Sequence, residues 1–368
     1  MHRFAHLSAA LMAALLVLPA CGKKSEKTGE KAGEKAGEKA EKKEWKPISK
    51  EMLSSFSALP ANFDSKKNPG TPAKLALGKQ LYHDARLSRS GTISCNSCHD
   101  LNNFGVDSKP TSPGHEGKTG DRNSPTTLNA AGHFRQFWDG REPDVEAQAK
   151  GPVLNPGEMG LKDAAEVEAI LKGIPGYVEG FKKAFPDAGD NAVTFDNFAL
   201  AVGAFERKLV TPSPWDKFLG GDTKALTEEQ QKGARVFVET GCISCHTGQL
   251  MGGKDYKKLG LIKPWPRTED IGRMKVTKKE EDKYFFKVPS LRNIAKTGPY
   301  FHDGKTTDLT EAVKLMARHQ LAKELSDADA KLIVAFLSSL TGTLDPELTK
   351  KPDLPKKLAA PVTPAAAQ

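Results

Sequence analysis

Two pentapeptides constrain this chain more than any other feature of its sequence. Residues 95–99 read Cys-Asn-Ser-Cys-His, and residues 242–246 read Cys-Ile-Ser-Cys-His. Two thiols three positions apart on one helical turn can add to the two vinyl groups of a haem, and the next histidine can ligate the iron. Each segment is therefore a predicted attachment site for a c-type haem. The predicted haem-binding residues are Cys95, Cys98, His99, Cys242, Cys245 and His246.

Paired cysteines have three other common uses: local disulfides, a four-cysteine zinc site and a thioredoxin-like redox pair. A zinc site does not need a histidine after both pairs, and these pairs lie too far apart in sequence for a zinc ribbon. Covalent haem attachment accounts for the histidine in both segments, so we prefer it.

The fifth cysteine, Cys21, follows a segment typical of exported proteins. Residues 1–20 contain Arg3, an apolar run over residues 7–18 and a small residue before Cys21. This order predicts a secretory signal peptide, and the run is shorter than the roughly 20 apolar residues of a membrane-spanning helix. A cysteine at this point resembles the bacterial lipobox, so we expect a lipid on Cys21 that anchors the chain to a bacterial membrane. The alternative is an ordinary signal peptide followed by a chance cysteine.

Residues 21–50 are predicted to be the lipidated cysteine and a flexible tether. Gly-Glu-Lys-Ala recurs from Gly29, Gly33 and Gly37, and the segment has no apolar face to bury. The folded part would then face the periplasm. The formal net charge of +9 does not indicate nucleic acid, which an exported chain does not meet; it favours an acidic redox partner.

The remaining sequence predicts helices and little strand. Residues 72–82 and 227–237 precede the two haem-binding segments and carry apolar residues at similar helical spacing. Thr227 with Gln230 also has the form of a capping box. Further helices are predicted over residues 163–172, 195–209, 308–319 and 326–340.

We therefore expect a mainly α fold with two cytochrome c-like haem domains, because about 300 residues suffice for two domains. The N-terminal haem domain would span residues 51–215 and the C-terminal one residues 216–345. The boundary is placed near the Pro- and Gly-rich residues 212–222, and residues 346–368 form a Pro-, Ala- and Lys-rich tail.

The second axial ligand of each iron decides whether a haem only transfers electrons or also activates a small molecule. A single histidine or methionine is usually a core or surface residue, so the residues alone leave this choice open. The candidates are His83, His115 and His133 for the first haem, and His302, His319, Met251, Met274 and Met316 for the second.

From about residue 75 to residue 340, the chain resembles the bacterial di-haem cytochrome c peroxidases. Besides the two haem-binding segments, the matching stretches are residues 104–107, 113–115, 122–126, 137–141, 148–152, 158–159, 291–293, 297–302, Met316 and residues 320–321. The predicted signal peptide and tether are additions to this pattern.

The resemblance implies a ligand set. His99 would be the proximal ligand of the N-terminal haem and His115 its distal ligand in the oxidised protein. His246 and Met316 would hold the C-terminal haem, and methionine ligation raises its potential, so this haem would accept electrons. Its reduction is expected to release His115 from the other iron, through an order-to-disorder change in residues 109–122.

The resemblance also assigns residues near the irons. Glu158 would move a proton during peroxide cleavage, Gln148 would orient the peroxide, and Trp138 would lie between the haems as an electron relay. Without the resemblance, Glu158 reads as a loop acid and Trp138 as a core residue. Asn123, Thr297 and Pro299 match an inter-domain calcium site, and calcium accepts neutral oxygen ligands.

The implied function is reduction of hydrogen peroxide to water at the N-terminal haem, with electrons from a small cytochrome c or cupredoxin entering at the C-terminal haem. A homodimer is included among the expected assemblies. The alternatives are a di-haem enzyme that oxidises a protein side chain or an organic substrate, and a di-haem electron carrier with both irons permanently six-coordinate.

Overall fold

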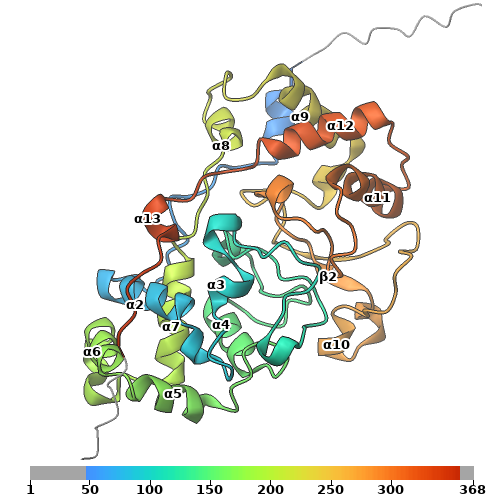
Figure 1. Ribbon diagram of the computed structural model, residues 1–368. Helices are drawn as coiled ribbons and strands as arrows, with labels where there is room; N and C mark the ends of the chain where they lie inside the picture. The colour runs from blue at the N-terminus through green and yellow to red at the C-terminus, as the bar shows by residue number, and fades with distance from the viewer. Residues whose placement is uncertain (1–46, 357–368) are drawn as a thin grey trace, which may run out of the picture. The chain divides into compact units, whose positions relative to one another are not determined.

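The computed structural model describes residues 47–356 (Figure 1). The predicted signal peptide, Cys21, nearly all of the predicted tether and the end of the tail lie outside these residues. The fold is mainly helical, as predicted. Across residues 47–356, regular strands are limited to β1 (Tyr256–Lys258) and β2 (Phe285–Lys287), which pair antiparallel with Tyr256 opposite Lys287. None of the helices in this range is long and apolar enough to cross a membrane.

A close helix crossing organises the N-terminal half. Helix α2 (Pro72–His83) begins with proline in its first turn and is capped by the Thr71 side chain, while α7 (Phe195–Glu206) is capped by Thr194. A Cβ added at Gly78 would lie 2.0 Å from the carbonyl oxygen of Ala201 and 2.9 Å from the Cβ of Phe205. The two backbones can approach this closely only because residue 78 has no side chain.

The C-terminal half repeats this crossing with α9 (Glu228–Thr240) and α12 (Asp327–Ser338). A Cβ at Gly233 would lie 1.8 Å from the carbonyl oxygen of Leu332 and 2.9 Å from the Cβ of Phe336. The predicted capping box of Thr227 with Gln230 is present. Residues 72–82 and 227–237, which look alike in sequence, are therefore equivalent helices of two similar halves.

The four other predicted helices are confirmed with small changes at their ends. Helix α5 (Ala164–Lys172) is capped by Asp163, and α11 (Leu309–Leu321) is capped by Asp308. Helices α7 and α12 end two or three residues before the predicted position. The remaining helices are α1 (Lys50–Leu53), α3 (Cys95–Cys98), α4 (Val145–Leu154), α6 (Pro175–Ala184), α8 (Pro214–Leu219), α10 (Met274–Thr277) and α13 (Pro346–Thr349).

The described residues form two apolar cores, and each core includes a segment from the opposite end of the described chain. Ile48 and Phe56 are buried in the C-terminal core with Trp215, whereas Leu344 is buried in the N-terminal core. Figure 1 shows the blue N-terminal segment beside α9 and the red C-terminal segment, with α13, running along α2. The division into domains at residues 215 and 216 therefore stays a prediction.

Part of the predicted tail is packed against the N-terminal half. Gln80 donates through Nε2 to the Asp353 carbonyl at 2.9 Å, and Arg86 donates through Nη1 to the Pro355 carbonyl at 2.9 Å. Residues 346–356 therefore fasten the C-terminal end of the described chain to α2 and the turn that follows it.

Replacing Gly233 with alanine should destabilise the protein strongly, because the new methyl group would meet a backbone oxygen that cannot rotate away. We expect the free energy of unfolding to fall by about 3 kcal/mol or more. Urea unfolding followed by circular dichroism measures this change.

Gly180→Ala is the matched control. Gly180 lies on α6, and a Cβ added there would meet a methyl group of Leu77 on α2 at 3.4 Å, an ordinary contact. This variant should retain the wild-type free energy of unfolding or gain up to about 1 kcal/mol, because alanine has a higher helix propensity than glycine. Equal effects of the two substitutions would contradict the importance of the crossing.

Candidate functional site

The first predicted haem-binding segment is a single helical turn followed by a buried histidine. Ser94 caps α3 (Cys95–Cys98) in a capping box with Ser97, so both sulfurs belong to one turn, as predicted. The Tyr82 hydroxyl of α2 donates to the His99 carbonyl at 2.7 Å and ties this turn to the helix crossing. Burial lowers the pKa of His99, which keeps the imidazole in the neutral form that ligates metals.

The second segment follows α9 directly. Gly241, with φ of 98°, ends the helix, and residues Cys242–Ser244 form a 3₁₀ turn. The Nδ1 atom of His246 lies 2.9 Å from the Met251 carbonyl oxygen. This hydrogen bond places the ring proton on Nδ1 and leaves Nε2 as the nitrogen able to ligate iron.

The chemistry of the cysteines disfavours the zinc and redox-pair alternatives. Burial raises the pKa of Cys95 and Cys242 strongly, and that of Cys98 to about 11. Zinc binding and thiol exchange require thiolates, which are favoured by a lowered pKa. The described cysteines form no disulfide, and residues 47–356 contain no group of three or more His, Cys, Asp or Glu side chains able to hold a metal ion.

A large cavity, the C-terminal cavity, adjoins the second haem-binding segment. It encloses about 1650 Å³, part of it open to solvent. Cys242, Cys245, His246 and Met316 all line it. Much of the remaining wall is apolar, and it includes Leu291, Ile294, Val313, Ile333 and Leu337. These residues suit a covalently attached haem with a histidine and a methionine at hand.

The structure separates Met316 from the other candidates for the second haem. Met251 is fully buried in the core, and Met251, Met274 and His319 do not line the cavity. His302 lines it but stacks on Phe286, with ring centroids 4.3 Å apart. Met316, on α11, is therefore the methionine that the fold brings to the cavity of His246.

On the N-terminal side, His115 packs against the turn over residues 155–160. Its backbone N–H donates to the Glu158 carbonyl at 2.7 Å, and its Nε2 lies 2.9 Å from the Pro156 carbonyl oxygen. A Cβ at Gly160 would lie 2.4 Å from this Nε2, so the turn holds the buried ring where only glycine leaves room.

The other two candidates for the first haem have different surroundings. His83 is buried at the end of α2, and burial lowers its pKa to about 4. His133 lies beside Lys287 in the wall of the C-terminal cavity.

Glu158 lies in the turn that holds His115. Burial raises the pKa of Glu158, although the Arg141 charge and a 3.0 Å hydrogen bond from Asn155 Nδ2 oppose this rise. The pKa of Cys98, raised mainly by burial, is raised further by the charges of Asp107 and Glu158, so the Glu158 carboxylate acts within electrostatic range of the first haem-binding segment. Gln148 lies partly buried on α4, which precedes this turn.

Trp138 and the three residues predicted to bind calcium meet at the C-terminal cavity. Asn123, Thr297 and Pro299 all line it, although the first lies far from the others in sequence. Trp138 also lines the cavity, and its Nε1 donates to the Asn123 carbonyl at 2.9 Å. Trp138 and Asn123 are therefore neighbours, and Thr297 and Pro299 line the same cavity.

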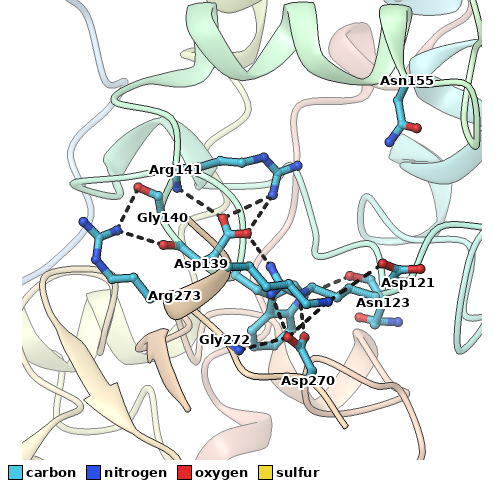
Figure 2. Close-up of polar contacts among 12 residues, drawn as sticks. Asp121, Asn123, Asp139, Gly140, Arg141, Asn155, Asp270, Gly272 and Arg273 are labelled. Atoms are coloured by element: carbon cyan, nitrogen blue, oxygen red, sulfur yellow. Dashed lines mark hydrogen bonds and ion pairs between the residues drawn. The ribbon is translucent and has the colours of Figure 1, made fainter. Parts of the chain in front are cut away.

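A buried ion-pair network that the sequence did not reveal lies beside these residues. Arg122 contacts Asp139 at 2.6 Å and Asp270 at 2.6 Å; Figure 2 labels both of these aspartates. Figure 2 also shows Arg141 beside the Asp139 carboxylate and Arg273 donating to the Asp139 carbonyl. Arg122 and Asp139 adjoin Asn123 and Trp138 in sequence, so the network joins these residues to the C-terminal half. Arg122 and Asp270 are 148 residues apart, and no local pattern pairs them.

Two cytochrome c-like halves, each with a haem-binding segment, define a di-haem c-type cytochrome. The family model for di-haem cytochrome c peroxidase matches residues 72–224, and the model for cytochrome c matches residues 230–341. The chain is 49% identical to cytochrome c551 peroxidase of Pseudomonas aeruginosa, over 72% of this chain and 78% of that protein. It is 46% identical to cytochrome c551 peroxidase of Nitrosomonas europaea, over 72% of this chain and 79% of that protein.

A solved structure agrees with this assignment. A crystal structure of a MauG-like protein associated with microbial copper homeostasis superposes with a TM-score of 0.68 at 27% identity, over 80% of this chain and 95% of that one. The chain belongs to the bacterial di-haem cytochrome c peroxidase family. It is an oxidoreductase that acts on peroxide, with two covalently bound haem c groups.

The stability of the protein should depend on Asp270 at acidic pH. Burial alone would raise the pKa of Asp270, but Arg122 lowers it to about 2. A carboxylate with a lowered pKa stabilises the folded state at pH values above 3.8, its pKa in the unfolded chain. This stabilisation is lost as the pH falls towards 2, its pKa in the folded protein. Asp270→Asn should lower the unfolding free energy by about 2 kcal/mol near neutral pH and flatten its decline below pH 4.

Asp121→Asn is the control, because Asp121 is exposed and only reaches Lys275 at 3.9 Å. Its stability should match the wild type throughout. Urea unfolding at a series of pH values tests both variants, and an unchanged acid profile in Asp270→Asn would refute the assignment.

Proposed function

We propose that this enzyme reduces hydrogen peroxide to water at the N-terminal haem, with electrons supplied at the C-terminal haem by a small redox protein. The observation that carries the proposal is the different situation of the two candidate second ligands. Met316 lines the cavity of His246, whereas the Nε2 of His115 is bound to a backbone carbonyl. In this proposal, both ligands of the C-terminal haem would come from the cavity wall, and the N-terminal haem would have a ligand that exchanges partners.

In the N-terminal site, Cys95, Cys98 and His99 would hold the haem, whose iron would supply the electrons that peroxide accepts. Glu158 carries the proton chemistry. Its carboxylate, kept in place by Asn155, takes a proton from one peroxide oxygen and delivers it to the other, which leaves as water. Burial supports this role because it raises the pKa of Glu158, which makes the carboxylate a stronger base for taking up the proton. Gln148 would orient the peroxide through its amide.

His115 acts as a displaceable ligand in this proposal. The turn over residues 155–160 offers a second position for the ring, in which the Pro156 carbonyl accepts the Nε2 proton. A nitrogen that donates its proton to a carbonyl does not also offer a lone pair to iron. Ligation and storage of His115 are therefore mutually exclusive, as a switch between closed and open sites requires.

Electron entry is proposed at the surface beside the C-terminal cavity. Leu261 and Ile262 are 50% and 59% exposed, and Gln320, which lines the cavity, accepts from the Leu261 N–H at 2.9 Å. Lys258 and Lys263 flank this apolar pair in sequence. Exposed apolar side chains with basic neighbours suit an acidic partner, which supports a small cytochrome c or cupredoxin as donor. Trp138, in the cavity wall, would relay the electron towards the N-terminal haem.

Calcium binding and location complete the proposal. Asn123, Thr297 and Pro299 would offer oxygens to one calcium ion at the cavity, in keeping with the neutral ligands that calcium accepts. We place the protein in the periplasm, anchored through a lipid on Cys21, on the strength of the lipobox-like sequence outside the described residues. The homodimer stays a prediction.

Glu158→Gln tests the chemical step. It keeps the shape of the side chain and removes the base, so peroxide turnover should fall by roughly 10² to 10⁴-fold. Stopped-flow spectra should show normal reduction of the C-terminal haem by donor. Glu179→Gln, a change at an exposed acid on α6, is the control and should turn over at the wild-type rate. Undiminished turnover in Glu158→Gln would refute the role. No turnover of peroxide by the wild type would favour an electron carrier or an oxidase of another substrate.

His115→Gly tests the displaceable ligand. Without the imidazole, the oxidised N-terminal haem should be high-spin, and activity should no longer depend on prior reduction. His319→Gln, a change at a half-buried histidine on α11 that does not line the cavity, should behave like the wild type. Electron paramagnetic resonance of the oxidised proteins measures the spin state of the N-terminal haem. A low-spin N-terminal haem in His115→Gly would show that another residue is the ligand.

A further inference from the structure

Lys287 carries a buried positive charge for which the chain supplies no carboxylate. It lies on β2, it is 6% exposed, and its Nζ is 3.0 Å from the Nδ1 of His133. None of the acidic side chains among residues 47–356 lies within 4.0 Å of this nitrogen. A buried lysine normally has an anionic partner, because removing an ammonium group from water is costly.

His133 cannot provide the missing charge. Burial lowers the pKa of His133 well below its usual value, and the Lys287 charge lowers it further, so the ring is neutral. Its Nδ1 accepts one of the three N–H groups of the lysine, and its Nε2 is buried with no partner in the described structure. His133 therefore orients the ammonium group, and two N–H donors remain for another acceptor. Burial lowers the pKa of Lys287 to about 8, and no neighbouring charge counters this effect.

Both residues line the cavity of Cys242, Cys245, His246 and Met316, and the composition of its wall identifies the missing partner. Among residues 47–356, no aspartate or glutamate lines this cavity, and Lys257 is the only other lysine that does. Lys257 is already paired with Asp255 at 2.6 Å, with a side chain 37% exposed. The group that fills the cavity must therefore bring the negative charge. A haem does so through its two propionate carboxylates.

We propose that Lys287, oriented by His133, binds a propionate carboxylate of the C-terminal haem. The inference rests on the proposed placement of that haem between His246 and Met316. Lys287 also donates through its backbone N–H to the Trp138 carbonyl at 2.8 Å. The same residue thus anchors the haem edge and the proposed relay residue. A fixed positive charge beside the haem also favours its reduced form, in which the iron carries one positive charge less.

Lys287→Met tests the proposal through the midpoint potential of the C-terminal haem, measured by spectroelectrochemical titration of the purified protein. The potential should shift to lower values, because the neighbouring positive charge is lost. Lys287→Arg keeps the charge and should retain most of the wild-type potential.

Lys257→Met is the matched control. It removes one lysine charge from the wall of the same cavity, but from an exposed and already paired side chain, so its shift should be much smaller. Equal shifts in Lys287→Met and Lys257→Met would overturn the proposal.

Titrating the protein with phosphate at constant ionic strength distinguishes a free anion bound at Lys287 from a haem propionate. The wild-type potential should not respond, because a propionate already occupies the site. A phosphate-dependent potential that disappears in Lys287→Met would overturn the propionate assignment.

Haem content per chain, measured as the pyridine haemochrome, keeps the test decisive if Lys287→Met assembles poorly. Loss of the C-terminal haem in Lys287→Met but not in Lys287→Arg supports the carboxylate site, whereas equal loss in both shows a packing role only. The low-spin spectrum of Met316→Ala checks the ligation separately. An unchanged spectrum there would refute the ligand assignment of the proposed function without bearing on the effect of Lys287.

Discussion

The close contact of two helix backbones at a glycine, made once in each half, is the interaction on which the rest of the structure depends. Gly78 lets α2 meet α7, and Gly233 lets α9 meet α12. One turn further along, Tyr82 packs on Phe205 and Phe237 packs on Phe336, with ring centroids 5.5 and 5.4 Å apart. The crossing then reaches the predicted iron ligands: the Tyr82 hydroxyl bonds the His99 carbonyl, and the Phe237 ring lies 6.4 Å from the His246 ring.

Two buried cationic side chains differ in whether the protein itself supplies the balancing negative charge or its ligand must supply it. Arg122 meets two carboxylates, Asp139 and Asp270, so its charge is balanced within the protein and the two halves are joined. Within the described part of the chain, Lys287 meets only a neutral imidazole, and no acidic side chain lines the wall of its cavity. The same rule, that a buried charge needs a partner, thus explains a structural cross-link in one case and points to the haem carboxylate in the other.

The two halves share a fold but surround their predicted haem sites with different kinds of structure. In the C-terminal half, Met316 comes from the regular helix α11, which the cap at Asp308 and the packing of α12 hold in place. In the N-terminal half, His115 comes from a short irregular segment that is held by the turn of Glu158. A ligand on a long helix is difficult to withdraw, whereas a ligand on a short turn can move with a few backbone rotations. This contrast suits one haem for electron transfer and the other for peroxide chemistry.

The sequence by itself determined the features that are written within a few turns of chain. The haem-binding segments, the capping box of Thr227 and the helices were predictable because spacing, caps and periodicity act locally. Likeness to a family then named His115, Glu158 and Met316. Only the tertiary structure decided that Met316, and not Met251, reaches the cavity of His246, and that Lys287 meets His133 across 154 residues. It also decided that Ile48 and Leu344 each complete the opposite core. These outcomes depend on which distant segments the helix crossings bring together, and no local pattern encodes that.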